Sequence, residues 1–132
     1  MILHHIGIVV DHLEDAAPLF EVWMRARRIG AIVEDVVQNA RIQLYLAAED
    51  SLLELIEPLD NDSISMHQIG DYHLCYTVPD IDIEMRRLHE LGAIVSSSIA
   101  TAPLFNNQRI AFLATHSGQL LELLENPLIP VA

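Results

Sequence analysis

The sequence contains no lysine, a single cysteine and no long apolar run among its 132 residues. One cysteine, Cys75, excludes an intrachain disulfide and is compatible with a reducing compartment. No apolar stretch approaches the roughly 20 residues that a membrane span needs. The first residues, MILHHIGIVV, lack the basic region and the small-residue cleavage site of a signal peptide. We therefore expect a cytoplasmic protein without a membrane partner.

Positive charge is scarce as well. Seven arginines stand against 19 acidic residues, which gives a formal net charge of −12. Such a charge argues against nucleic acid or an anionic membrane as a partner. Because arginine suits bidentate binding of carboxylates and phosphates, an anionic substrate would be bound by the pair Arg41 and Arg109 or by the cluster Arg25, Arg27 and Arg28. For the cluster, solvated or ion-paired surface side chains are the simpler interpretation.

Segments of the two halves match at one fixed distance along the chain. The stretch LLELIE at residues 52–57 is repeated as LLELLE at residues 120–125. The residue pairs 68 positions apart (73 − 5, 109 − 41 and 122 − 54) are His5 and His73, Arg41 and Arg109, and Glu54 and Glu122. Three matches at one offset predict a duplicated module. Since a module of about 65 residues is marginal by itself, the two halves should share a core.

Each half is predicted to contain a strand, a helix and three further strands. In the first half, Asp11 followed by Glu14 predicts the start of a helix that Gly30 ends, while Pro18 indicates a later start or a kink. Leu13, Ala17, Phe20 and Met24 would form its apolar face. In the second half, Pro79 or Asp80 begins the helix and Gly92 ends it.

Module boundaries follow from these patterns. We assign residues 1–58 to the first module, residues 59–70 to a polar connector and residues 71–132 to the second module, the two forming one domain together. The tetrapeptide GAIV occurs at 30 and at 92, a step of 62 rather than 68, so the first helical region should be six residues longer. In the second half, six additional residues in the loop TAPLFNNQ would restore the step of 68, and this loop is a candidate substrate-contacting loop.

Two histidines and two glutamates are the candidate functional residues. His5, Glu54, His73 and Glu122 each lie in a short apolar run that predicts a buried strand. A buried carboxylate is costly unless it is paired, hydrogen-bonded or bound to a metal, and this set of nitrogen and oxygen donors suits a divalent ion. Two other interpretations remain open. A duplication copies core residues as readily as ligands, and LLELIEP could end an amphipathic helix.

Two βαβββ units, each with a histidine in its first strand and a glutamate in its last, resemble the vicinal oxygen chelate superfamily. Its members include glyoxalase I, methylmalonyl-CoA epimerase, extradiol dioxygenases and antibiotic-resistance proteins. Four segments look most like the epimerase and glyoxalase I-like branch: HHIGIVVDHLEDA, LELIEPLDNDS, YHLCYTVPDID and GQLLELLE. The resemblance implies an α+β fold in which two tandem βαβββ modules pack edge to edge around an open metal-centred cavity.

The resemblance also implies a cofactor and a reaction. One divalent ion (Co, Ni, Zn, Mn or Fe) would be held by His5, Glu54, His73 and Glu122. The enzyme would be an epimerase or isomerase that removes a proton α to a carbonyl through a metal-bound enolate, with Glu122 as the main base and Glu54 as second base or ligand. We expect substrate contacts from Arg41, Arg109 and Gln43. The expected substrate is an acyl-CoA, a thioester or a related α-acidic carbonyl compound, bound by a homodimer.

The sequence departs from both branches. Some related epimerases have an amide where this chain has Glu54 and a catalytic glutamate on the preceding strand, for which Gln43 is the nearest residue. Glu54 itself is typical of glyoxalase I, yet ATHSGQ at 114–119 replaces the DPDGY-like run usual in that enzyme. A glyoxalase I (lactoylglutathione lyase)-like enzyme is therefore one alternative. A small-molecule-binding or resistance protein without turnover is the other.

Overall fold

The computed structural model describes residues 1–36, 38–60 and 69–128. Most of the predicted connector, residues 61–68, lies outside the described residues. The chain divides into two compact units, which are described separately below. The first unit is His5–Tyr72, and the second unit is His73–Ala132 together with Met1–His4.

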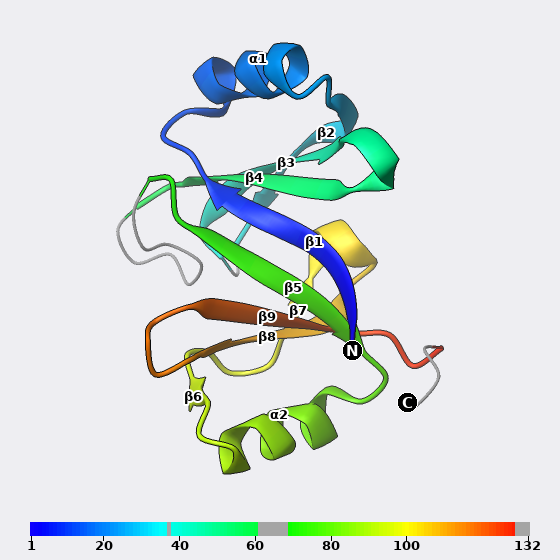
Figure 1. The fold of residues 1–132 in the computed structure, drawn as a ribbon, viewed down its shortest axis with the longest axis vertical. Coiled ribbons are helices and arrows are strands. Elements are labelled where there is room, and N and C mark those ends of the chain that lie inside the picture. The colour runs from blue at the N-terminus through cyan, green and yellow to red at the C-terminus, as the bar shows by residue number, and fades with distance from the viewer. Residues whose placement is uncertain (37, 61–68, 129–132) are drawn as a thin grey trace. The chain divides into compact units, whose positions relative to one another are not determined.

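The first unit is a sheet with one helix on it. Strand order is β2-β3-β4-β1; β3 is antiparallel to both β2 and β4, and β1 is parallel to β4. Helix α1 lies over one face of this sheet (Figure 1). The elements are β1 (Ile2–Val9), α1 (Leu13–Trp23), β2 (Arg27–Asp35), β3 (Ala40–Leu46), the short 3-10 turn η1 (Ala48–Asp50) and β4 (Leu52–Pro58).

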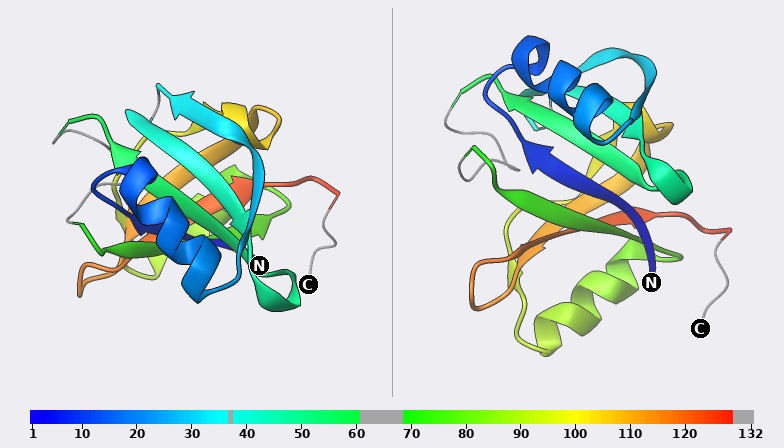
Figure 2. Two further views of the ribbon diagram at one scale, coloured as in Figure 1. Left: turned by 90° about the horizontal axis from the view of Figure 1, so that it is seen from above. Right: turned by 45° about the horizontal axis from the view of Figure 1, so that its top comes forward.

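The second unit repeats this plan with an interrupted second strand. Strand order is β5-β9-β8-β6, with β7 also paired to β8, and β5 is parallel to β9. Helix α2 runs alongside β8 and β9 in two different views (Figures 1 and 2). The elements are β5 (Tyr72–Val78), α2 (Ile81–Glu90), β6 (Ile94–Val95), β7 (Ala100–Ala102), the 3-10 turn η2 (Pro103–Phe105), β8 (Gln108–Ala114) and β9 (Leu120–Glu125).

Each helix buries its apolar face against its own sheet. In the first unit Leu13 and Ala17 of α1 pack with Leu53 and Leu55 of β4. In the second unit the corresponding cluster contains Ile81, Ala111, Leu113 and Leu123. Since strand side chains alternate between faces, these contacts define a helix side for each sheet. The opposite face is called the site side below, because it carries the candidate histidines and glutamates.

The first helix is shorter than the sequence predicts. It ends at Trp23, and Met24, expected on the apolar face, is the C-cap and 47% exposed. Arg25 then takes a left-handed conformation, with φ 52°. Gly30, with φ 66°, lies within β2, close to where the pairing of β2 with β3 shifts register. The prediction that the first helical region is six residues longer than the second is therefore wrong: α1 has 11 residues and α2 has 10, and the irregular edge strand β2 accommodates the extra residues.

The start of the first helix also differs from the prediction. His12, not Asp11, is the N-cap residue, and the His12 side chain makes no capping hydrogen bond. Glu14 makes an ion pair with Arg41 instead of closing a capping box. Helix α2 begins as predicted, because the Asp80 side chain accepts a hydrogen bond from the backbone N–H of Ile83.

An arginine in each unit joins the helix to the sheet. Arg41 of β3 lies 2.7 Å from Glu14 of α1 and 2.7 Å from Glu57 of β4. At the positions 68 residues later, Arg109 of β8 lies 3.0 Å from Asp82 of α2 and 2.7 Å from Glu125 of β9. We call each of these groups of one arginine and two carboxylates a clasp.

The second clasp also organises the start of α2. Arg109 donates to both carboxylate oxygens of Glu125, and one of these oxygens accepts a 2.9 Å hydrogen bond from the backbone N–H of Ile81. The hydrogen bonds from Arg109 lower the pKa of Glu125 below 4.5. In the first clasp, the hydrogen bond from Arg41 likewise lowers the pKa of Glu14. Glu14 and Glu125 are therefore held in their charged form by the arginines.

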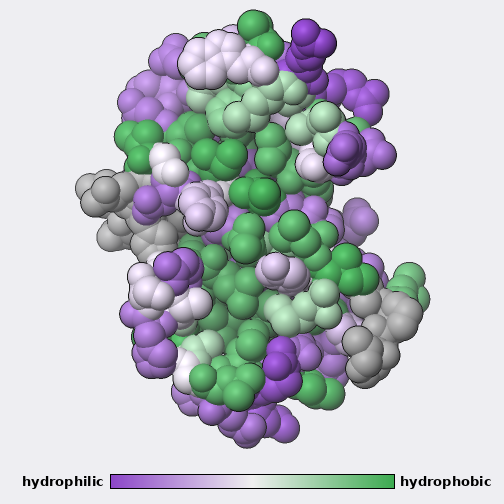
Figure 3. All heavy atoms as spheres, in the orientation of Figure 1, coloured by the Kyte–Doolittle hydropathy of each residue, from purple (hydrophilic) through white to green (hydrophobic). Residues whose placement is uncertain are grey.

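Apolar side chains also reach the surface. Green, apolar spheres occupy much of the face drawn in Figure 3. On α1, Val22 is 72% exposed and Trp23 is 77% exposed. Neither of the two described helices is long and apolar enough to cross a membrane.

Replacement of Glu125 by Gln should destabilise the protein in a pH-dependent way. We expect a loss of about 1–2 kcal/mol of unfolding free energy at neutral pH, because charge-assisted hydrogen bonds to Arg109 are lost. The hydrogen bonds from Arg109 lower the pKa of Glu125 in the folded protein, so its contribution is fully present above the unfolded pKa and is lost as the pH falls through the lowered folded pKa. Urea unfolding at several pH values measures both effects.

Arg86→Gln is the matched control, since this exposed arginine of α2 has no ion pair with the described residues. A Glu125→Gln deficit that persisted unchanged in acid would contradict the electrostatic account.

Candidate functional site

His5 and Glu54 form a buried pair in the first unit. They come from the parallel strands β1 and β4, in which Gly7 lies opposite Glu54. His5 Nε2 is 3.5 Å from Glu54 Oε2, and both side chains are 0% exposed.

His73 and Glu122 form the corresponding pair in the second unit. Strands β5 and β9 are parallel, and Cys75 lies opposite Glu122. His73 Nε2 is 3.2 Å from Glu122 Oε1, and both side chains are 1% exposed. The ring of Phe112 packs edge-on against His73, with centroids 5.5 Å apart. The aromatic contact restricts the orientation of the imidazole.

The donor atoms in these pairs are suitable for a divalent metal. Each unit buries one imidazole and one carboxylate on the site side of its sheet, on two parallel strands. Imidazole nitrogen and carboxylate oxygen are common ligands of Zn, Ni, Co, Mn and Fe. A buried carboxylate needs a cation or hydrogen-bond donors to offset its desolvation. The residues present therefore fit a metal, and their role as ligands stays a prediction.

The structure places Arg41 and Arg109 away from these pairs. Leu44 lies opposite Glu54 in the β3–β4 register, so Arg41, three residues from Leu44, is on the helix side. In the same way Phe112 lies opposite Glu122, and Arg109 is on the helix side of the second sheet. Both arginines are held in the clasps, and their placement does not support the prediction that they contact substrate.

Gln43 is also on the helix side. It is 1% exposed, and its Nε2 donates to the backbone oxygens of Ile29 at 3.1 Å and Gly30 at 3.2 Å. A third hydrogen bond goes to its neighbour Leu44. Gln43 thus holds the irregular segment of β2 against β3. This placement gives it a structural task and does not support a contact with substrate.

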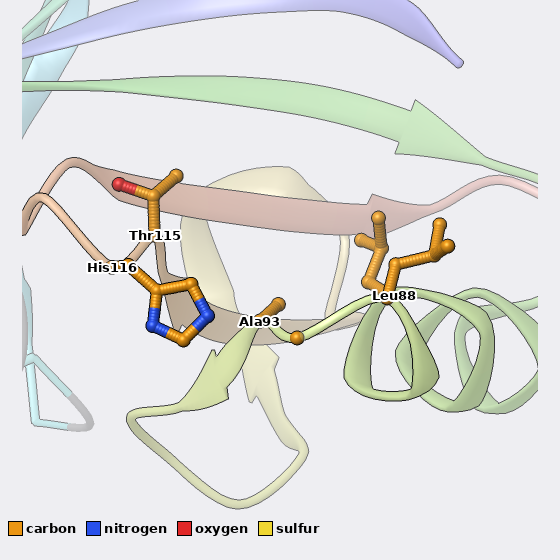
Figure 4. Close-up of a pocket in the computed structure, with 6 residues that line it drawn as sticks. Leu88, Ala93, Thr115 and His116 are labelled. Atoms are coloured by element: carbon orange, nitrogen blue, oxygen red, sulfur yellow. The ribbon is translucent and has the colours of Figure 1, made fainter.

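A shallow hollow in the second unit lies apart from the histidine–glutamate pair. It has a volume of about 200 Å³ and is lined by the end of α2 and by the turn between β8 and β9. Leu88 and Ala93 form its apolar part, and His116 stands at its edge beside Thr115 (Figure 4). Its lining contains one exposed imidazole, that of His116, and no carboxylate, so the hollow lacks the histidine–glutamate combination of the buried pairs.

Glu57 and Glu125 are structural partners of Arg41 and Arg109 that the sequence patterns did not predict. Each lies three residues after a candidate ligand, and the two are themselves 68 positions apart, as 125 − 57 shows. Because three residues along a strand change the face, the motif LLELIE contains one glutamate for each side of the sheet. The 68-residue repeat, read together with the alternation of side chains along a strand, distinguishes the candidate ligands Glu54 and Glu122 from the arginine partners Glu57 and Glu125.

Comparisons with known proteins agree with this geometry. Residues 4–112 match the sequence model of the Glyoxalase/Bleomycin resistance protein/Dioxygenase superfamily. A search of curated protein sequences finds no significant match.

Among solved structures, methylmalonyl-CoA epimerase from Mycobacterium tuberculosis is 26% identical, with a TM-score of 0.76 over 97% of this chain and 88% of that one. The Streptomyces coelicolor methylmalonyl-CoA epimerase in complex with 2-nitronate-propionyl-CoA is 20% identical, with a TM-score of 0.75 over 96% of this chain and 97% of that one. The halotolerant catechol dioxygenase BphC is 18% identical, with a TM-score of 0.64 over 94% of this chain and 40% of that one.

Substitutions at Gln43 test its assignment to the helix side. Gln43→Glu should cost about 3–5 kcal/mol of unfolding free energy, because a buried carboxylate would face backbone oxygens. Gln43→Leu, which removes the donors without adding charge, should cost about 1–3 kcal/mol. Urea unfolding at neutral pH gives both values. A stable Gln43→Glu protein with new catalytic activity would show that this side chain reaches the site.

Proposed function

Because the chain belongs to the glyoxalase/bleomycin resistance protein/dioxygenase superfamily, we propose that it is a divalent-metal-dependent epimerase or isomerase acting next to a carbonyl group. The observation that carries the proposal is the pair of buried histidine–glutamate couples in matching strands of the two halves. The proposed ligands are His5, Glu54, His73 and Glu122. Similarity to methylmalonyl-CoA epimerases supports an acyl-CoA or related thioester as the substrate.

The proposed reaction uses the two glutamates in turn. When bound, a divalent ion would supply Lewis-acid polarisation of the substrate carbonyl. Glu122 takes the proton from the carbon next to that carbonyl, and Glu54, protonated beforehand by solvent, gives its proton to the opposite face of that carbon. Glu122 then releases its proton to solvent. Their origin in equivalent strands of a duplicated module supports this division of roles. Burial of both carboxylates favours proton transfer, since water competes little for them.

A glyoxalase I-like reaction is the second candidate. The observation that favours it is a carboxylate, rather than an amide, at position 54. Proton transfer between adjacent carbons of a hemithioacetal would use the same glutamates. Thiol-dependent loss of methylglyoxal, with no exchange on an acyl-CoA, would identify this reaction.

Metal content tests the ligand set. The purified full chain should contain about one equivalent of divalent metal, as a four-ligand protein site does. His5→Ala and His73→Ala should each lose most of it, because a nitrogen ligand is removed. His89→Ala, at an exposed histidine of α2, is the control and should keep the metal. A wild-type protein that binds no metal even after reconstitution would overturn the proposal and favour a small-molecule-binding protein without turnover.

Isotope exchange in deuterated water separates the two glutamates. With one epimer of methylmalonyl-CoA, Glu122→Gln should slow exchange of the α-proton by at least about 100-fold, as expected for loss of a general base. Glu54→Gln should still exchange the proton but should no longer invert the centre. Mass and chiral analysis of the product record both results.

Glu90→Gln, at an exposed position on α2, serves as the control. Unchanged exchange and inversion in Glu122→Gln would exclude Glu122 as the base.

A further inference from the structure

The seven arginines differ in what they contact. Four of them, Arg28, Arg41, Arg87 and Arg109, make ion pairs with acidic side chains of their own unit. Within the described part of the chain, the other three, Arg25, Arg27 and Arg86, make no side-chain hydrogen bond or ion pair, and all are exposed. In a protein with 19 acidic residues, an arginine left without a carboxylate is available for an external anion.

Of these three, Arg27 is the one on a strand. Arg25 follows the end of α1 in a left-handed conformation, and Arg86 is on α2. In the sheet register Arg27 of β2 lies opposite Leu46 of β3, and Leu46 lies opposite Leu52 of β4. Leu52 is two residues from Glu54 and therefore on the same face. Arg27 thus lies on the site side of the first sheet, with His5 and Glu54.

Arg28, the next residue in the sequence, lies on the other face of the first sheet. Arg28 lies opposite Tyr45 on the helix side and donates to its hydroxyl group at 3.3 Å. Arg28 also makes an ion pair with Glu21 of α1 at 3.2 Å. Consecutive arginines therefore lie on opposite faces: Arg28 is neutralised by a carboxylate of α1, and Arg27 has no carboxylate partner among the described residues.

The spacing between Arg27 and Glu54 suits an elongated substrate. Arg27 is two strands and two residues away from Glu54, which corresponds to about 12 Å between Cα atoms for ordinary strand spacing. Half-buried leucines, Leu44, Leu46 and Leu52, lie between them on the same face. A ligand with a reactive carbonyl at Glu54 would pass over an apolar surface before its far end met the guanidinium group.

We propose that Arg27 binds the phosphate groups of an acyl-CoA whose acyl end lies at His5 and Glu54. The inference rests on the proposed function for the position of the acyl end. Arginine matches phosphate geometry through parallel N–H donors, and coenzyme A has its phosphates at the end remote from the thioester, beyond the neutral pantetheine chain. Arg27 would then contribute to substrate affinity without taking part in proton transfer.

Binding of propionyl-CoA to the metal-loaded full chain tests this inference without any need for turnover. Arg27→Gln should raise the Kd of propionyl-CoA about tenfold, as expected for one lost charge-assisted contact. Arg27→Lys should retain part of the affinity. For propionyl-pantetheine, which lacks the phosphates at the far end of coenzyme A, wild type and Arg27→Gln should have the same Kd. The controls are Arg25→Gln and Arg86→Gln, which remove the same charge elsewhere and should bind like wild type.

Three results would overturn the inference: no binding of propionyl-CoA by the wild type, equal affinity in wild type and Arg27→Gln, or an equal loss for both ligands. Failure of the proposed function has a different signature. Binding of propionyl-CoA that depends on Arg27, without α-proton exchange on methylmalonyl-CoA, would leave the phosphate contact standing and remove the epimerase.

Discussion

Each half of the chain has to accommodate two glutamates, three residues apart, on a strand in the interior of its sheet. The pleat sends such residues to opposite faces, so each strand presents a carboxylate both to the helix and to the site side. A buried carboxylate without a partner costs several kcal/mol. On the site side, the carboxylate is close to a histidine of the parallel neighbouring strand. On the helix side, it pairs with an arginine of the antiparallel neighbouring strand.

The clasps show why the cations of this protein are arginines. Arg41 contacts Glu57 through one terminal nitrogen and Glu14 through the other, and thereby joins a strand to a helix. A guanidinium group offers donors in fixed directions that can serve two carboxylates at once, whereas an ammonium group is a single point charge. At the equivalent position Arg109 joins β9 to α2 in another way: one terminal nitrogen donates to both Asp82 and Glu125, and Nε donates to Glu125 as well. Replacement by lysine would keep the charge and lose the bridge.

The repeat and the strand period made most of the fold predictable. The offset of 68 placed matching strands and histidine–glutamate pairs in both halves, and Asp80 marked the start of α2. The end of the first helix could not be predicted from Gly30, because the chain used Arg25 for the left-handed turn and placed the glycine in an irregular edge strand. Residue type alone favours Arg41, Arg109 and Gln43 as substrate contacts, but the alternation of side chains along β3 and β8 places all three on the helix side.

The distribution of charge limits how this protein can accept an anionic substrate. A net charge of −12 repels anions at long range, although salt screens that repulsion beyond about 8 Å. Attraction must therefore come from cations close to the site. Arg41 and Arg109 cannot supply it, because each is accompanied by two carboxylates and its clasp is negative as a whole. On the site side of the first sheet, Arg27 makes no ion pair with the residues that the structure describes, so its charge would act undiminished on the phosphates of the proposed acyl-CoA.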